Sequence, residues 1–216
     1  MKVLISDFDG TFYDDNYSEN INFINNLNID FIIATGRHYF SLKNDLKIAC
    51  KYYICNDGAY ILDSNQNFIY KNSINEEDAK IIYKRIQELN INDFFLDSYE
   101  KLTTDLVYPI NKFSIKIKNK KTAGDILTKL IFNLDNVYGY LSENYINILN
   151  INSTKDIAID YLVKKEKYDK VYVVGNEIND YNMINKYNGY LITKDKNNNF
   201  NCINKFIELK DIIKNS

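Results

Sequence analysis

Four short apolar runs, each followed by a glycine, constrain the fold of this chain more than any other feature. The chain has only 7 glycines in 216 residues. Continuous apolar runs are typical of strands buried on both faces, and glycine permits the backbone turn that leads out of a strand. The pattern predicts an α/β fold: a doubly wound, Rossmann-like parallel sheet covered by helices. The runs are residues 3–9 before Gly10, 31–35 before Gly36, 52–57 before Gly58 and 171–174 before Gly175.

Two aspartates leave the first run together. Asp7 and Asp9 are at positions i and i+2, so in a strand their side chains point to the same face. Paired carboxylates repel unless a proton or a cation lies between them, and an oxygen-only pair suits a hard ion such as Mg²⁺. In open α/β sheets ligands bind outside the carboxyl ends of the strands, so the four glycine loops should share one edge. The pair predicts a metal or phosphoryl site. The same motif, Asp-x-Asp-Gly, also occurs in solvated turns that have no such function.

The chain alternates strand and helix except in its middle third. We expect residues 1–75 and 151–216 to form the α/β core, and residues 76–150 to form a smaller inserted α+β cap. The predicted helices are 18–27, 39–49, 76–89, 122–134, 155–164, 181–186 and 203–214. The predicted strands are 2–6, 30–34, 52–55, 60–62, 68–70, 93–97, 113–118, 136–141, 145–150, 171–174 and 190–192.

Composition limits the class of protein. Hydrophobic residues make up 45% of the chain, enough for a sizeable core. The sequence has no apolar stretch of about twenty residues and no basic-then-apolar start, so we expect a cytoplasmic protein without a membrane partner. A net charge of −2 lacks the basic footprint that nucleic-acid binding needs. The three cysteines fit no metal-ligand spacing, and we expect a monomer or a weak homodimer.

The polar residues at the ends of the apolar runs carry a family resemblance. The segments are Asp7-Phe8-Asp9-Gly10-Thr11, Ala34-Thr35-Gly36-Arg37, Asn56-Asp57-Gly58-Ala59, Lys155 opening a helix, and Gly175-Asn176-Glu177-Ile178-Asn179-Asp180. In order and spacing they resemble the motifs of the haloacid dehalogenase superfamily, and more narrowly its Cof-type phosphatase branch, which inserts a cap after the third strand. The resemblance covers the core, whereas the cap matches only in position and pattern. One such motif is weak evidence, but their ordered co-occurrence is specific.

The resemblance implies a Mg²⁺-dependent phosphatase of small phosphorylated metabolites. Asp7 is similar to the family nucleophile that forms an aspartyl-phosphate, and Asp9 to the general acid and base. Thr35 would offer a hydroxyl to the phosphoryl oxygens, and Lys155 would neutralise their charge. Asp7 and the backbone carbonyl of Asp9 would also ligate the metal. The remaining candidates for phosphate or substrate binding are Gly10, Gly36, Arg37, Asn56, Gly58 and Asn179.

The fourth motif departs from the family pattern. An acidic metal ligand usually follows the glycine, but this chain has Asn176 there, with Glu177 next and Asp180 three residues further on. An amide oxygen can ligate Mg²⁺ but adds no negative charge, so affinity should fall unless Glu177 or Asp180 compensates. All three stay candidate metal ligands.

Several alternatives remain open from the sequence. Arg37 could bind an anionic substrate group or pair with a carboxylate, and His38 could reach the substrate or be an exposed helix residue. Asn179 could hold a phosphate oxygen or Lys155, or cap a helix. Besides a phosphatase, the pattern allows a phosphosugar phosphotransferase or mutase, a weakened relative that only binds a phosphorylated ligand, and a phospho-receiver module. The cap residues that would set specificity cannot be aligned from one sequence.

Overall fold

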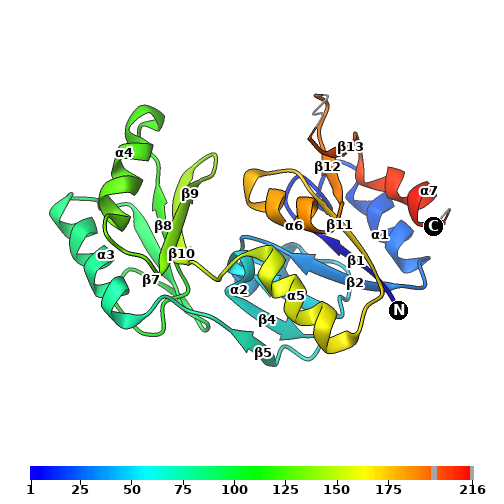
Figure 1. Cartoon of the computed structure of the whole chain (residues 1–216), viewed down its shortest axis with the longest axis horizontal. Coiled ribbons are helices and arrows are strands. Elements are labelled where there is room, and N and C mark those ends of the chain that lie inside the picture. Colours follow the sequence, from blue (N-terminus) through cyan, green and yellow to red (C-terminus); the bar gives the residue numbers. More distant parts are fainter. Residues whose placement is uncertain (196–198, 215–216) are drawn as a thin grey trace.

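The chain forms two lobes, each built around its own sheet (Figure 1). The computed structural model describes residues 1–195 and 199–214. Within them, no helix is long and apolar enough to cross a membrane.

The larger lobe contains an eight-stranded sheet in the order β13-β12-β11-β1-β2-β3-β4-β5. The pairs from β13 to β3 are parallel, and β4 and β5 add an antiparallel hairpin at one edge. This confirms the predicted α/β class. The strands are β1 (Lys2–Ser6), β2 (Asp30–Ala34), β3 (Tyr52–Cys55), β4 (Tyr60–Asp63), β5 (Phe68–Lys71), β11 (Lys170–Gly175), β12 (Tyr190–Ile192) and β13 (Asn201–Ile203).

Helices cover both faces of this sheet because its central strands are apolar on both sides. Side chains alternate along β1, so Leu4 packs into the cluster on one face while Val3 and Ile5 pack into the cluster on the other. The first face carries α1 (Tyr17–Asn25), α2 (Tyr39–Asp45) and α7 (Leu209–Lys214), and the second carries α5 (Lys155–Glu166) and α6 (Tyr181–Lys186).

The smaller lobe lies between β5 and α5 in the chain and contains an antiparallel sheet in the order β7-β6-β8-β10-β9. One face of that sheet packs on two helices, which lie on the side away from the larger lobe (Figure 1). Its elements are α3 (Glu76–Glu88), β6 (Phe94–Asp97), β7 (Leu102–Thr103), β8 (Lys112–Lys116), α4 (Lys120–Ile131), β9 (Val137–Leu141) and β10 (Tyr145–Asn150). The inserted α+β module therefore exists, while its proposed boundaries as an independent cap stay a prediction.

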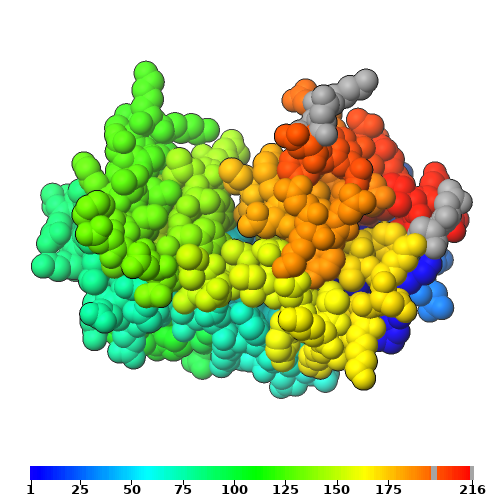
Figure 2. Space-filling model, viewed as in Figure 1, coloured from blue at the N-terminus to red at the C-terminus, as the bar shows by residue number. Residues whose placement is uncertain are grey.

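The surface is hollowed between the two lobes (Figure 2). Strand alternation decides what faces this hollow: Phe113 and Ile115 of β8 point into the apolar core with the helices, and Lys112 and Ser114 point toward the larger lobe.

The chain ends differ from the sequence-based expectation. Residues 203–214 were expected as one helix, but Ile203 closes β13, which pairs in parallel with β12, and α7 begins only at Leu209. A three-residue edge strand is too short to produce a readable period. The helix expected over 39–49 also ends early, at Asp45, because Leu46 is extended.

Candidate active site

Four loops meet at one edge of the core sheet, as the glycines predict. Strands β11, β1, β2 and β3 are consecutive neighbours and parallel, so their carboxyl ends lie together. They deliver Asn176, Asp7, Thr35 and Asn56 to this edge. Helix α5 begins at the same edge with Lys155 as its first residue.

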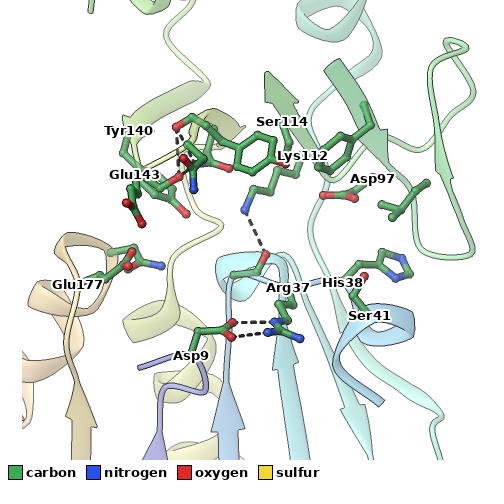
Figure 3. Close-up of a pocket in the computed structure, with 18 of the residues that line it drawn as sticks. Asp9, Arg37, His38, Ser41, Asp97, Lys112, Ser114, Tyr140, Glu143 and Glu177 are labelled. Atoms are coloured by element: carbon green, nitrogen blue, oxygen red, sulfur yellow. Dashed lines mark hydrogen bonds and ion pairs between the residues drawn. The ribbon is translucent and has the colours of Figure 1, made fainter. Parts of the chain in front are cut away.

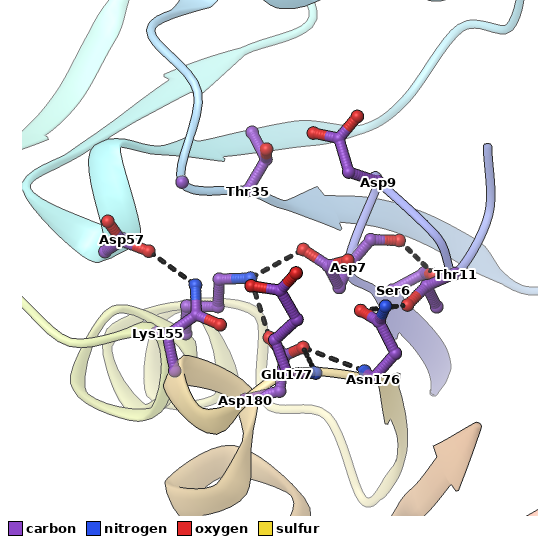
Figure 4. A network of polar contacts seen from close by, with 12 residues as sticks. Ser6, Asp7, Asp9, Thr11, Thr35, Asp57, Lys155, Asn176, Glu177 and Asp180 are labelled. Atoms are coloured by element: carbon purple, nitrogen blue, oxygen red, sulfur yellow. Dashed lines mark hydrogen bonds and ion pairs between the residues drawn. The ribbon is translucent and has the colours of Figure 1, made fainter. Parts of the chain in front are cut away.

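Asp7 and Lys155 form a buried ion pair, although 148 residues separate them in the sequence (Figure 4). Lys155 Nζ donates to Asp7 Oδ1 and to Asp180 Oδ1, each at 2.7 Å. Lys155 is 1% exposed and Asp180 0%. Burial alone would lower the pKa of Lys155, but the surrounding carboxylates of Asp180, Asp7 and Asp57 outweigh it and raise that pKa. The ammonium therefore stays charged beside Asp7.

Burial also raises the pKa of Asp7, to about 7. Lys155 opposes this shift, and the carboxylates of Asp180 and Asp9 add to it. The charge balance around Asp7 therefore depends on the partners that enter the site. Lys155, together with a bound cation, would supply the positive charge that stabilises a dianionic phosphoryl group beside Asp7.

The Asp180 carboxylate is fully engaged. Its Oδ1 contacts Lys155, and its Oδ2 accepts hydrogen bonds from the backbone N–H groups of Asn176 at 2.9 Å and Glu177 at 3.0 Å. This geometry argues against the expectation that Asp180 ligates a metal. It instead holds Lys155 and the loop after β11 in place.

Asp9 is paired with Arg37 on the open side of the site (Figure 3). Arg37 Nε donates to Asp9 Oδ2 at 2.7 Å, Nη2 donates to Asp9 Oδ1, and Nη1 contacts Asp45 Oδ2 at 2.5 Å. Of the two alternatives for Arg37, pairing with a carboxylate is the one that the structure shows. Both Asp9 oxygens therefore lie against the guanidinium.

Thr35 and Gly36 present polar groups at the end of β2. Thr35 Oγ1 accepts from the backbone N–H of Arg37 at 3.1 Å, which leaves its own hydroxyl proton to donate. The carbonyl of Gly36 accepts from Lys112 Nζ at 3.1 Å. Helix α2 is capped by His38 and not by Thr35, since His38 Nδ1 accepts from Phe40 N–H.

Positions 10 and 58 require glycine, because the backbone angle φ is positive there and another segment of the chain lies very close. Both have positive φ values, +69° and +102°. A Cβ on Gly58 would lie 2.3 Å from the Thr154 carbonyl oxygen, so this glycine lets the start of α5 reach the site. A Cβ on Gly10 would lie 2.5 Å from Asn176 Nδ2, so the first and fourth motifs are in contact. Asn56 is fully buried and does not line the hollow between the lobes.

The residues at this edge could bind a hard cation only with a mixture of carboxylate, amide and carbonyl oxygens. Across residues 1–195 and 199–214, no three His, Cys, Asp or Glu side chains gather as a metal site. Asp7 keeps one carboxylate oxygen away from Lys155, and Asn176 Oδ1 lies at the same loop, where it accepts from Thr11 Oγ1 at 3.0 Å. Glu177 is exposed and lines the hollow. Carboxylate, amide and carbonyl oxygens suit Mg²⁺.

The two lobes are joined by Asp57, Lys112 and Tyr140, to which the sequence alone assigns no role. Lys112 Nζ of β8 contacts Asp57 Oδ2 at 2.7 Å, and Tyr140 Oη of β9 donates to the same oxygen at 2.9 Å. Asn179 Nδ2 donates to Asp57 Oδ1 at 2.8 Å, and its Oδ1 has no hydrogen-bond partner in the described part of the chain, so Asn179 contacts neither Lys155 nor a helix end there. Burial would raise the pKa of Asp57, but Lys112 and Lys155 overcome it and hold that pKa below its usual value.

A cavity of about 590 Å³ lies above Asp7 and Asp9, between the loops and the polar face of the smaller sheet (Figure 3). The period-2 alternation of residues 112–116 is the sequence signal that could have found this face. His38 also lines it, but is buried and contacts the Ser98 carbonyl through Nε2 at 2.7 Å, so it is not an exposed helix residue. The lining residues from the smaller lobe are Phe95, Asp97, Leu102, Lys112, Ser114, Tyr140, Ser142, Glu143, Asn144, Tyr145 and Asn147.

Comparison with known proteins identifies the family. Residues 4–122, more than half of the chain, match the model of the haloacid dehalogenase-like hydrolases. A Buchnera aphidicola protein provisionally named a phosphatase is 28% identical over 82% of this chain and 72% of its own length.

Solved structures share the fold at lower identity. A Streptococcus mutans protein superposes with a TM-score of 0.83 at 19% identity and covers 100% of both chains. A protein described as a subclass IIB sugar phosphatase has a TM-score of 0.78 at 15% identity, over 100% of this chain and 98% of its own. The family match, together with the inserted α+β module, confirms the predicted resemblance. This chain belongs to the haloacid dehalogenase-like hydrolases, in their Cof-type branch.

Proposed function

We propose that this protein is a phosphomonoesterase that acts on small phosphorylated metabolites through an aspartyl-phosphate on Asp7. The observation that carries the proposal is the buried contact of Asp7 with Lys155 at the floor of a cavity between the lobes. Phosphoryl transfer needs an in-line nucleophile and neutralisation of phosphoryl charge, and this pair offers both.

Asp7 serves as the nucleophile, and Asp9 serves first as an acid and then as a base. One carboxylate oxygen of Asp7 attacks phosphorus, and the bond from phosphorus to the ester oxygen breaks as that oxygen takes a proton from Asp9 in its protonated form. Water then attacks the aspartyl-phosphate, Asp9 takes a proton from that water, and inorganic phosphate leaves with Asp7 restored. Lys155 and the Thr35 hydroxyl contact the phosphoryl oxygens. Asp9 acts after it has turned away from Arg37.

Asp7, the backbone carbonyl of Asp9 and Asn176 would hold Mg²⁺. The ion, when bound, would supply positive charge that offsets the phosphoryl oxygens. Asn176 contributes a neutral oxygen, so the set carries less negative charge than one with two carboxylates, and we expect weak Mg²⁺ binding.

The size of the cavity supports a small substrate. A volume of about 590 Å³ lies in the range of small-molecule sites. The structural similarity to a described sugar phosphatase supports a sugar phosphate or a comparable metabolite.

Hydrolysis of p-nitrophenyl phosphate, measured with and without Mg²⁺, tests the proposal. Asp7→Asn should lower turnover by at least about a thousandfold, because an amide is a poor nucleophile. Asp15→Asn, which changes an exposed aspartate shortly after the same strand, is the matched control and should leave turnover unchanged. Borohydride reduction of acid-quenched enzyme should convert phosphorylated Asp7 to homoserine, detectable by mass spectrometry. If Asp7→Asn protein that is free of deamidation turns over substrate at nearly the wild-type rate, the assignment of Asp7 as the nucleophile is refuted.

A further inference from the structure

Asp97 is a buried carboxyl group that faces the cavity between the lobes. It ends β6 on the polar face of the smaller sheet and is 3% exposed (Figure 3). Its Oδ1 has no hydrogen-bond partner among the described residues. Burying an unpaired carboxylate costs several kcal/mol, so this oxygen calls for a proton, a water or a ligand group as its partner.

The neighbouring cation does not satisfy Asp97. Lys112 lies opposite Asp97 in the pairing of β6 with β8. Its Nζ, however, is turned to the larger lobe, where it contacts Asp57 Oδ2 and the Gly36 carbonyl. Burial raises the pKa of Asp97 to about 7, Lys112 opposes the shift, and Asp57 adds to it. The group therefore gains from a hydrogen-bond donor brought by a ligand.

The rest of the cavity repels anions. Besides Asp97, the carboxylates of Glu143 and Glu177 line it. The lysine and arginine that line it, Lys112 and Arg37, are already paired with aspartates. A second phosphate or a carboxylate on the leaving group would find no unpaired lysine or arginine among these lining residues.

We propose that Asp97 is a specificity-determining residue that accepts a hydrogen bond from an ammonium or hydroxyl of the leaving group and disfavours leaving groups with a second anion. This inference rests on the proposed phosphatase function. It assigns the phosphoryl group to Asp7 and Lys155, and the donor-bearing end of the substrate to the smaller lobe.

A series of linear alkyl phosphates tests the assignment. The chains increase in length and end in ammonium, hydroxyl, methyl or carboxylate, so that one length reaches Asp97. For wild type, kcat/KM at that length should fall in the order ammonium, hydroxyl, methyl, carboxylate. The ammonium should exceed the methyl by about 10- to 100-fold, the range for a hydrogen bond to a charged group.

Two substitutions separate charge from hydrogen bonding. Asp97→Asn keeps an acceptor oxygen, so the preference for hydroxyl over methyl should remain, while the preference for ammonium over carboxylate should fall at least about tenfold. Asp97→Leu should lose the preference for hydroxyl over methyl, and its preference for ammonium over carboxylate should fall at least as far as in Asp97→Asn. Asp125→Asn, an exposed aspartate on α4 on the far side of the same lobe, is the control and should keep the wild-type order.

Calorimetric dissociation constants for the same compounds should show the same order, with or without turnover. A wild-type order led by methyl or carboxylate, or an unchanged order in folded Asp97→Asn and Asp97→Leu, overturns the role of Asp97. Absence of hydrolysis for every ester, with the binding order intact, overturns the phosphatase proposal and leaves the recognition by Asp97 supported.

Discussion

Gly58→Ala should destabilise the protein strongly, because Gly58 combines a forbidden backbone angle with a close backbone neighbour. Its φ is +102°, and an added Cβ would lie 2.3 Å from the carbonyl oxygen and 2.6 Å from the carbonyl carbon of Thr154. Backbone strain of this kind costs about 1–3 kcal/mol, and forcing extra volume into a packed site costs about 1–3 kcal/mol. The added Cβ would collide with main-chain atoms of Thr154, which cannot rotate away as a side chain could. We therefore expect the free energy of unfolding to fall by about 2–6 kcal/mol.

Urea denaturation provides the measurement, with Gly124→Ala as a matched control. Gly124 lies within α4, and an added Cβ would meet nothing within 4 Å, so the same substitution should stabilise by about 0.5–1 kcal/mol. Each substitution adds one methyl group to the wild-type protein, but the two should move the urea midpoint in opposite directions. Gly58→Ala should also lower turnover of the folded fraction, because a shift of Thr154 moves Lys155 away from Asp7. A midpoint for Gly58→Ala equal to that of wild type would refute the steric reasoning.

Further consequences follow from the contacts of Asn176, Lys112 and His38. Asn176→Asp adds a carboxylate beside Asp7, so half-saturation by Mg²⁺ should occur at least about threefold lower in concentration, whereas an unchanged titration midpoint would remove Asn176 from the metal site. Lys112→Met leaves Asp57 buried without its cation and should cost about 3–5 kcal/mol of unfolding free energy, with part recovered in the double variant with Asp57→Asn; strictly additive costs would contradict the coupling. Burial lowers the pKa of His38, against a hydrogen bond to the Ser98 carbonyl, so the unfolded chain binds more protons below the usual histidine pKa of about 6.5. Stability should therefore decline as pH falls through that value, and less steeply in His38→Asn, which keeps a capping acceptor; parallel pH profiles would show that His38 does not contribute.

The core fold, and the loops that lie together at its edge, follow from local patterns in the amino-acid sequence. Apolar runs without alternation demand helices on both faces of a parallel sheet, and parallel strands place their carboxyl ends at one edge. The sequence therefore places Asp7, Thr35 and Asn176 together. The order of the motifs was sufficient to recognise the family.

The tertiary structure decided which partner each of these groups contacts. Asp180 could be placed near the site, but only the fold shows that its oxygens are taken by Lys155 and by backbone N–H groups. Arg37 had two possible kinds of partner in the sequence, and in the folded chain it contacts the carboxylates of Asp9 and Asp45.

The face of the smaller lobe lay furthest beyond sequence reasoning. Lys112 and Asp57 are 55 residues apart and belong to different lobes, so no local pattern connects them. Alternation indicates that Asp97 and Lys112 share one face of a strand pair, but which face meets the core depends on how the helices of that lobe pack. Short-range periodicity fixes how a side chain leaves its own strand, whereas long-range packing fixes what it meets, and the cavity with its unpaired carboxyl group is a result of that packing.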